Sequence, residues 1–484
     1  MLDSLKRLTK NSAIYGIGHI FARSIAFFLL PIYTNFLPTE DFGVAVLLLS
    51  LLAVCNIFYV YGMDSAFLRY FIEAEQIGEK KSIFSTVFYS ILGTALLFSV
   101  VGYHFADELA GLIFGTTAHA ELLQLCFGIL FFDGLSAIPF LALRAEEKSV
   151  QFVSLKSLIT IATLLLNWIF IIHWQWGLAG IFRANLYASA AGFLLLLPVV
   201  FRYLFGRFSL SSFKLLMRFG LPYIPSTLAV ILMDVIDRFF LERMAGSSAV
   251  GLYGAGYRLG MFMALFIAAF RFAWHPFFLA TAKKPDAQAI FSKVLSYFLL
   301  SCACVFLAIS YFIDDIVRVQ IGKYHIFGEA YWQSTTVVPI VMLAYVFYGA
   351  YVNFVVGIHI KKKTQYLPLI TGAGLIANIV GNLLLIPRWN ILGAAWATVI
   401  SYAIMALALY FVAQRLYPVR YEFGRIAKLV TIVGVFYANF ALLQWGFVSK
   451  LGFGLLFIGA LFASGFIRPK ERQVIRSAFL KRIR

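Results

Sequence analysis

Long apolar stretches recur along nearly the whole sequence, and they constrain the fold more than any other feature. Each stretch is near 20 residues long and carries few charges, which is the length that an α-helix needs to cross a bilayer. The chain is 62% hydrophobic and only 13% charged, whereas soluble proteins are about one quarter charged. We therefore expect an all-α polytopic membrane protein with about 14 transmembrane helices, at approximately 12–36, 43–63, 82–104, 120–143, 151–173, 177–201, 219–241, 249–270, 290–312, 334–360, 365–386, 391–413, 426–444 and 451–467.

Lys and Arg residues distinguish the two sides of the predicted membrane, because cytoplasmic loops hold an excess of them. With the N-terminus placed inside, most of the 40 Lys and Arg residues fall in the inner segments, and the outer segments hold only Arg243, Arg318, Lys323, Arg388 and Lys450. We therefore expect both termini in the cytoplasm. This topology explains the net charge of +18 without a nucleic-acid partner. The first span has no small-residue cleavage site close behind it, so we expect no cleavable signal peptide.

Enzyme and metal signatures are not found in the sequence. It contains no G-x-x-x-x-G-K-[ST] for ATP phosphates and no H-E-x-x-H for zinc. Its four cysteines all fall inside predicted spans, where they indicate neither a disulfide framework nor a metal site. A glycan polymerase is the main enzymatic alternative, but such enzymes carry a large outer loop, and the longest one here, about Phe312 to Gln333, is modest. We therefore expect no enzyme, no cofactor and no metal.

Short similar segments recur in the two halves of the chain. Glu40-Asp41-Phe42-Gly43 after the first span resembles Ser248-Ala249-Val250-Gly251 after the seventh, and Asn167 in the fifth span matches Asn382 in the eleventh. Because each half has an even number of spans, the halves share one membrane orientation. The pattern predicts two parallel-repeat six-helix bundles with a site at their interface. The predicted domains are residues 1–212, residues 213–416, and residues 417–484 with two extra helices and a basic tail.

Arginines inside the predicted spans are the leading candidates for a binding site. Arg23 lies roughly 18 Å into the first apolar helix at about 1.5 Å per residue, Arg258 lies well inside the eighth span, and Arg183 lies nearer the outer surface. Ionisable groups at such depth are costly and are functional by default. Arginine binds phosphate oxygens through a planar fork and keeps its proton, so these residues predict a cavity for an anion. Asp133, in the fourth span, is either a counter-ion to Arg23 or a site for H⁺ or Na⁺ coupling.

The seventh span carries a second group of charges. Asp234 and Arg238 are four residues apart, which is the spacing of an intrahelical ion pair, and Asp237 is adjacent. We favour a structural pair that closes the outer end of the helix. In the alternative, a gate, Asp234 or Asp237 pairs with Arg258 in the inward-facing state and releases it later.

Several motifs carry a resemblance that covers nearly the whole sequence: Leu5-Lys6-Arg7-Leu8-Thr9-Lys10-Asn11-Ser12, Leu29-Leu30-Pro31-Ile32-Tyr33-Thr34, Thr39-Glu40-Asp41-Phe42-Gly43, Arg218-Phe219-Gly220-Leu221-Pro222-Tyr223-Ile224-Pro225 and Gly251-Leu252-Tyr253. Together they resemble the multidrug/oligosaccharidyl-lipid/polysaccharide exporter superfamily, and within it the bacterial polysaccharide-biosynthesis branch of lipid-linked oligosaccharide flippases. A relative that flips the peptidoglycan lipid precursor has cationic residues in its first and eighth spans. By that likeness, Arg23 and Arg258 would contact the diphosphate, with help from Arg183.

The resemblance implies an alternating-access flippase in the bacterial cytoplasmic (inner) membrane, acting in surface polysaccharide biosynthesis. Its implied partners are an anionic polyprenyl-diphosphate-linked glycan, membrane lipids, and a polysaccharide polymerase with other assembly proteins. Two alternatives remain open. One is a proton- or sodium-coupled exporter of cationic drugs on the same fold, which would need an acid-rich cavity, whereas the deepest charges here are basic. The other is a scaffold of the assembly machinery that transports nothing.

Overall fold

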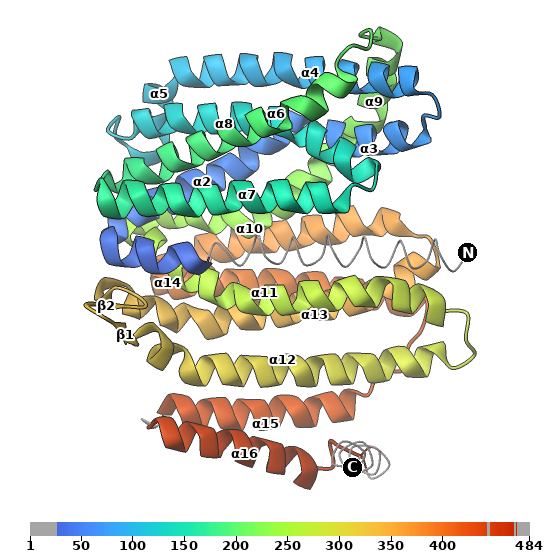
Figure 1. Ribbon diagram of the computed structural model, residues 1–484. Coiled ribbons are helices and arrows are strands. Elements are labelled where there is room, and N and C mark those ends of the chain that lie inside the picture. The colour runs from blue at the N-terminus through green and yellow to red at the C-terminus, as the bar shows by residue number, and fades with distance from the viewer. Residues whose placement is uncertain (1–26, 443–445, 469–470, 472–484) are drawn as a thin grey trace, which may run out of the picture. The chain divides into compact units, whose positions relative to one another are not determined.

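The computed structural model describes residues 27–442, 446–468 and 471, so Arg23 lies outside the described residues. The described chain is built almost entirely of long helices (Figure 1). In order, the elements after the helical stretch Phe27–Phe36 are α2 (Thr39–Val60), α3 (Met63–Glu73), α4 (Ile77–His104), α5 (Ala106–Phe114), α6 (Ala120–Ala145), α7 (Ser149–Asn167), η1 (Trp168–His173), α8 (Gly177–Tyr203), α9 (Leu210–Gly220), η2 (Leu221–Tyr223), α10 (Ile224–Ala245), α11 (Ser247–Thr281), α12 (Ala287–Val317), β1 (Gln320–Ile321), β2 (Tyr324–His325), η3 (Glu329–Val337), α13 (Val338–Ile360), η4 (Thr364–Tyr366), α14 (Leu367–Leu416), α15 (Phe423–Leu442) and α16 (Phe447–Ala463).

The prediction of an all-α polytopic membrane protein is confirmed. Within the described ranges, 11 helical segments are long and apolar enough to cross a membrane, and Phe27–Phe36 and Ser449–Ala463 are shorter apolar helices. The short antiparallel pair β1–β2, in the loop that follows α12, is the one sheet assigned in the described chain. Helices dominate because no water reaches the bilayer core, where every backbone N–H and C=O must be satisfied within its own segment.

Helix α14 is two helices joined by a break, which explains why the sequence predicts two spans here. Asn390 has φ 49° and ψ −126°, a conformation outside the helical region. Beyond it the chain folds back on itself, and the Ser401 hydroxyl donates a hydrogen bond to the Gly374 carbonyl at 2.7 Å. A Cβ on Gly393 would lie 2.3 Å from the Leu385 carbonyl oxygen, so glycine is required for this close return.

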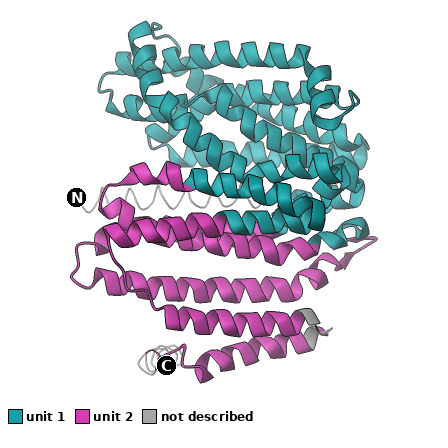
Figure 2. Cartoon of the chain, turned by 180° about the vertical axis from the view of Figure 1, so that it is seen from behind, with its two compact units in different colours: residues 1–259, 327–334, 371–401 teal, residues 260–326, 335–370, 402–484 magenta. Residues whose placement is uncertain are grey.

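The chain divides into two compact units (Figure 2). One comprises residues 1–259, 327–334 and 371–401, and the other comprises residues 260–326, 335–370 and 402–484. Residues 213–259, which the sequence analysis assigns to the second bundle, therefore pack with the first unit. The units group residues that touch, whereas the predicted domains follow a sequence repeat, so the boundaries at 212 and 416 stay a prediction.

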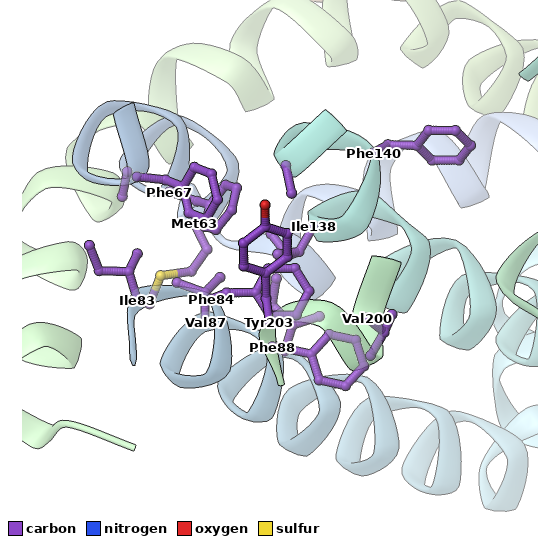
Figure 3. Close-up of a cluster of buried hydrophobic side chains, with 14 of the residues drawn as sticks. Met63, Phe67, Ile83, Phe84, Val87, Phe88, Ile138, Phe140, Val200 and Tyr203 are labelled. Atoms are coloured by element: carbon purple, nitrogen blue, oxygen red, sulfur yellow. The ribbon is translucent and has the colours of Figure 1, made fainter. Parts of the chain in front are cut away.

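Aromatic side chains fill the core of the first unit. Phe67, Phe84 and Tyr203 are fully buried there, and the Tyr203 ring packs 5.4 Å from the ring of Phe84 (Figure 3). Helices α4, α6 and α8 supply most of this cluster, together with α3. Close packing of this kind is what joins helices inside a membrane, where the lipid is as apolar as the side chains. The core thus fixes the scaffold on which the polar residues of the first unit are placed.

Candidate functional site

Arg258 is a half-buried cation in the first unit. It belongs to α11, and its guanidinium carbon lies 5.0 Å from the ring centroid of Phe42 on α2. Tyr33 and Arg238 are the ionisable groups that act on it electrostatically. Within the described part of the chain, no carboxylate lies within the 4.0 Å ion-pair distance of Arg258. A guanidinium inside a predicted span, with an aromatic face beside it and no carboxylate in ion-pair contact among the described residues, is suited to receive an anion.

Aromatic residues pack around Phe42, the ring beside this arginine, at the end of α2 where the helix begins. The ring of Phe42 packs 5.7 Å from those of both Tyr33 and Tyr331. The Tyr33 hydroxyl donates to the Asn167 side-chain oxygen at 2.9 Å, and the Tyr331 hydroxyl donates to the carbonyls of Leu37 and Pro38 at 3.0 and 2.9 Å. These buried phenol hydrogen bonds fix the aromatic rings on one side of Arg258.

Two glycines allow α2 and α11 to meet at the same end. A Cβ on Gly43 would lie 1.7 Å from the Ser247 carbonyl oxygen, and one on Gly251 would lie 2.0 Å from the Thr39 carbonyl oxygen. The hydroxyls of Thr39 and Ser248 are 2.7 Å apart. These contacts join the two segments that resemble each other in sequence, Glu40-Asp41-Phe42-Gly43 and Ser248-Ala249-Val250-Gly251. The backbones of α2 and α11 are therefore in close contact at this end of the first unit.

The charges of α10 form a compact network beside this contact. Arg238 Nη1 lies 3.6 Å from Asp237 Oδ1 and donates to the Asp234 carbonyl at 2.5 Å. The Tyr253 hydroxyl donates to Asp237, and the Arg238 guanidinium lies 4.8 Å from the Tyr257 ring. Asp237 and Arg238 are both buried. The ion pair shown by the structure therefore joins neighbouring residues of α10, and the contacts with Tyr253 and Tyr257 tie α10 to α11. The predicted roles of Asp234, Asp237 and Arg238 in gating or coupling stay predictions.

Arg183 lies near the start of α8, and its partners differ from those of Arg258. Its Nη2 is 2.7 Å from Glu121 Oε1 at the start of α6, and its guanidinium lies 5.0 Å from the Trp176 ring. One third of the Arg183 side chain is exposed. An arginine that already has a carboxylate and an aromatic partner at a helix end fits an interfacial position.

A cavity of about 580 Å³ opens in the first unit, near the other end of α2. Its polar lining comes from seven elements, α2, α3, α6, α7, α8, η2 and α10: Asn56, Asp64, Ser65, Asp133, Ser136, Arg144, Lys156, Ser189, Tyr223 and Thr227. The helix break at Tyr61 and Gly62, both with positive φ, separates α2 from α3 at its edge. Such a volume lies within the range of about 300–1,000 Å³ that small-molecule sites occupy.

Asp133 and Lys156 face this cavity from α6 and α7. Asp133 interacts with the Ser189 hydroxyl and, electrostatically, with Lys156. The Lys156 ammonium lies 4.3 Å from the Phe140 ring centroid. Both residues are accessible from the open space. The sequence analysis singled out Asp133 but missed Lys156, although it falls inside the predicted span 151–173.

Comparison with known proteins identifies the family. The model of the polysaccharide biosynthesis protein family matches residues 8–282, more than half of the chain. An uncharacterized membrane protein of Methanocaldococcus jannaschii is 23% identical over 477 residues, covering 88% of this chain and 89% of that protein. An uncharacterized membrane protein of Haemophilus influenzae is 24% identical over 425 residues, covering 82% of this chain and 96% of that protein.

Solved structures share the fold at low sequence identity. The lipid II flippase MurJ in an inward closed conformation has a TM-score of 0.76 and 16% identity, covering 96% of this chain and 100% of that chain. An inward-facing multidrug resistance MATE family transporter of the MOP superfamily has a TM-score of 0.64 and 14% identity, covering 85% and 96%. These neighbours are a flippase and a transporter rather than enzymes. The chain therefore belongs to the polysaccharide biosynthesis protein family, as a multi-pass membrane protein with the fold of the multidrug/oligosaccharidyl-lipid/polysaccharide exporter superfamily.

Proposed function

We propose that this protein is a flippase that moves a polyprenyl-diphosphate-linked oligosaccharide across a bacterial cytoplasmic membrane for surface polysaccharide biosynthesis. The observation that carries the proposal is Arg258, a half-buried cation in a helix long and apolar enough to cross a membrane, with no carboxylate in ion-pair contact among the described residues. A diphosphate supplies the missing negative charge and matches the planar fork of arginine. Family membership and the fold neighbours are consistent with a lipid-linked substrate of this kind.

Alternating access gives the two ends of α2 different roles in this proposal. If the N-terminus is cytoplasmic, as the Lys and Arg pattern predicts, the Thr39 end of α2 is the outer end. At that end Gly43 of α2 packs closely against Ser247, whereas the cavity lies beside Val60, near the other end of α2. The first unit then has the form expected when the substrate enters from the inner leaflet. Opening of the outer end would carry the diphosphate past Arg258.

Arg23 and Arg183 complete the proposed cationic group. Arg23 keeps the role given by the resemblance, as the second diphosphate contact. Arg183, already paired with Glu121, would assist near the outer surface rather than bind the substrate alone. A polysaccharide polymerase that receives the translocated glycan is the proposed protein partner.

The proposal is tested by transport in proteoliposomes that contain the purified full-length protein. The probe is undecaprenyl diphosphate carrying a fluorescent disaccharide, and the readout is the fraction of probe accessible to a membrane-impermeant quencher. We expect the protein to raise the translocation rate at least ten-fold over empty liposomes. A rate equal to that of empty liposomes, under imposed H⁺ and Na⁺ gradients as well as without them, would refute the proposal.

A coupled exporter of cationic drugs is the second candidate. Asp133 and Asp64 line the cavity as accessible acids, and a multidrug transporter shares the fold. The same proteoliposomes distinguish the two, because an exporter would move a fluorescent cation such as ethidium against its gradient and leave the lipid probe in place. The balanced charge of the cavity favours the flippase.

A further inference from the structure

We infer that the cavity beside α6 and α7 is a sugar subsite, in which Asp133 and Lys156 bind hydroxyl and amide groups of the glycan while the diphosphate is bound elsewhere. This inference rests on the proposed function and extends it, because it divides the substrate between two places in the first unit. It concerns the residues of the cavity alone, all of which belong to that unit.

The charges of the cavity are balanced. Two acidic residues, Asp64 and Asp133, line it together with two basic residues, Arg144 and Lys156. A diphosphate placed here would bring at least two negative charges next to both carboxylates, and the like-charge repulsion would be strong in a low dielectric. A neutral ligand with many hydroxyl groups meets no such cost. The cavity is therefore suited to sugars rather than to phosphate.

Asp133 and Lys156 attract each other electrostatically but do not form a direct ion pair. Each acts on the other electrostatically, yet no contact within the 4.0 Å ion-pair distance joins them. Both side chains are accessible from the cavity. Because both line the same cavity, a carboxylate that accepts and an ammonium that donates can each bind hydroxyl or amide groups of one ligand, since such groups both donate and accept.

The rest of the lining has the composition that sugars require. Asn56, Ser136, Ser189 and Thr227 offer side-chain donors and acceptors, and Phe140 and Phe152 offer apolar faces. A pyranose ring likewise has polar edges and apolar C–H faces. Pockets that combine apolar walls with a few placed polar groups are typical of small-molecule sites.

The sugar subsite and Arg258 lie at different depths. Phe42, beside Arg258, and Asn56, in the cavity lining, are both on α2. Their spacing along this helix corresponds to about 20 Å at roughly 1.5 Å per residue. The two places therefore contact different chemical parts of one substrate, and substitutions in them should have separable effects on binding.

The test uses the full-length protein in detergent and two probes: undecaprenyl diphosphate alone, and undecaprenyl diphosphate carrying di-N-acetylchitobiose. Dissociation constants of both lipids are measured for the wild-type protein and for the double variant D133N/K156Q. We expect the disaccharide to tighten binding at least ten-fold in the wild-type protein and less than two-fold in the double variant. Binding of undecaprenyl diphosphate alone should stay within two-fold.

The double variant keeps the cavity neutral and keeps hydrogen-bonding groups at both positions, which protects folding. The single variants Asp133→Asn and Lys156→Gln provide the same readout if the double variant unfolds. The matched control is D286N/K283Q, which makes the same two changes at exposed positions between α11 and α12, and it should bind both lipids as the wild-type protein does.

Two results would overturn the sugar subsite alone: a wild-type protein that binds both lipids equally well, or a double variant that weakens both lipids by the same factor. A wild-type protein that binds neither lipid would instead refute the proposed function, and the subsite with it. Tight binding of ethidium that requires Asp133 would likewise overturn both, in favour of the exporter.

Discussion

The free energy of Arg258 depends on two opposing terms, the cost of placing its charge in the membrane and the gain from its contact with Phe42. An arginine within a bilayer is costly, by about 2.5–3.5 kcal/mol or more when it lies at the centre of a helix, and a cation–π contact such as the one with Phe42 returns only about 0.5–2 kcal/mol. Among the described residues, no carboxylate makes up the difference. The residue is therefore poised to gain free energy when an anionic group arrives, which is the property expected of a binding residue rather than a structural one.

Replacing Arg258 should separate binding from stability. We expect Arg258→Gln to weaken binding of undecaprenyl diphosphate by about 10- to 100-fold, since a hydrogen bond to a charged group is worth about 1.5–3 kcal/mol. Arg258→Lys should retain part of the affinity, because an ammonium keeps the charge and loses the fork. Titration of the lipid against purified protein measures both effects.

The matched control is Arg207→Gln, which removes the same charge from an exposed loop and should leave the affinity unchanged. The thermal unfolding temperature of Arg258→Gln should equal or exceed that of the wild-type protein, since an uncompensated charge is removed. A variant that unfolds more easily and binds the lipid normally would show that Arg258 is structural.

The position of Lys156 in the cavity could not be predicted from the sequence alone. A lysine close to the predicted start of a span resembles an interfacial residue, and it is easily counted among the basic residues of the inner loops. In the structure α7 begins at Ser149, so Lys156 lies two turns inside the helix. Which way it points depends on how α6 and α8 pack against α7. Hydropathy predicts that these helices exist, but it does not predict which helices pack against each other.

At the scale of elements, the contact between α2 and α11 is the closure that the proposed transport cycle has to open. Gly43→Ala should weaken this closure, because its methyl group would lie 1.7 Å from the Ser247 carbonyl oxygen and the two backbones must separate. Overpacking of this kind typically costs about 1–3 kcal/mol. We expect faster labelling of a cysteine introduced as Ser248→Cys, measured with a membrane-impermeant maleimide.

Gly93→Ala in α4 is the control for this experiment, because a Cβ there meets nothing within 4 Å and alanine favours a helix over glycine. That variant should label at the wild-type rate. Equal labelling of Gly43→Ala and Gly93→Ala would show that the contact of α2 with α11 does not restrict access.

Element boundaries were predictable where composition changes sharply and less so elsewhere. The sequence separates the two halves of α14, because Pro387 and Arg388 interrupt the apolar run, and the structure has its break at Asn390. In contrast, α4 begins at Ile77, earlier than the predicted limit of 82. Its first turns carry Lys80 and Lys81, and charges end an apolar window without ending a helix.

For the molecule as a whole, an ionic network joins the segments around the last two helices. Glu422 Oε2 lies 3.1 Å from Arg425 Nη1, and Glu422 Oε1 lies 2.6 Å from Arg468 Nη2. Arg425 Nη2 also lies 2.7 Å from Glu471 Oε2. These contacts connect the start of α15 with the segment after α16. Helices α15 and α16 are thereby held together by charges as well as by their apolar interface with α12.

Acid should release this network. Burial by itself raises the pKa of Glu422, but hydrogen bonds from Ser296 and Arg425, with the charge of Arg468, outweigh it and lower the pKa below its ordinary value of 4.5. A lowered folded-state pKa contributes stability that is present above 4.5 and is lost as the pH falls through the folded-state value. Glu422→Gln should therefore lower the unfolding temperature by a few degrees at neutral pH.

The same variant should show a smaller loss of stability between neutral pH and about pH 4 than the wild-type protein does, because the titrating carboxylate is gone. Glu73→Gln is the control: its pair with Arg69 is more than half exposed, and such pairs contribute little. Unfolding followed by intrinsic fluorescence gives both curves. Identical pH profiles for the wild-type protein and Glu422→Gln would contradict this account.

The fold class was more predictable than the grouping of the helices. The presence of many apolar spans follows from local apolarity, which is why the fold class agrees with the structure. The packing of residues 213–259 with the first unit depends on close contacts such as that of Gly43 with Ser247. Contacts between helices distant in sequence leave no periodic signal, so neither this grouping nor the cavity could be read from the chain alone.

The most direct test of the central proposal is a lipid extraction from the native host with this gene deleted. A flippase of lipid-linked glycans predicts that a polyprenyl-diphosphate-linked oligosaccharide accumulates on the cytoplasmic side and that the surface polymer is lost. Wild-type protein and Arg207→Gln should restore both, and Arg258→Gln should not. Normal levels of every such lipid, together with increased sensitivity to cationic drugs, would contradict the account and identify the protein as an exporter.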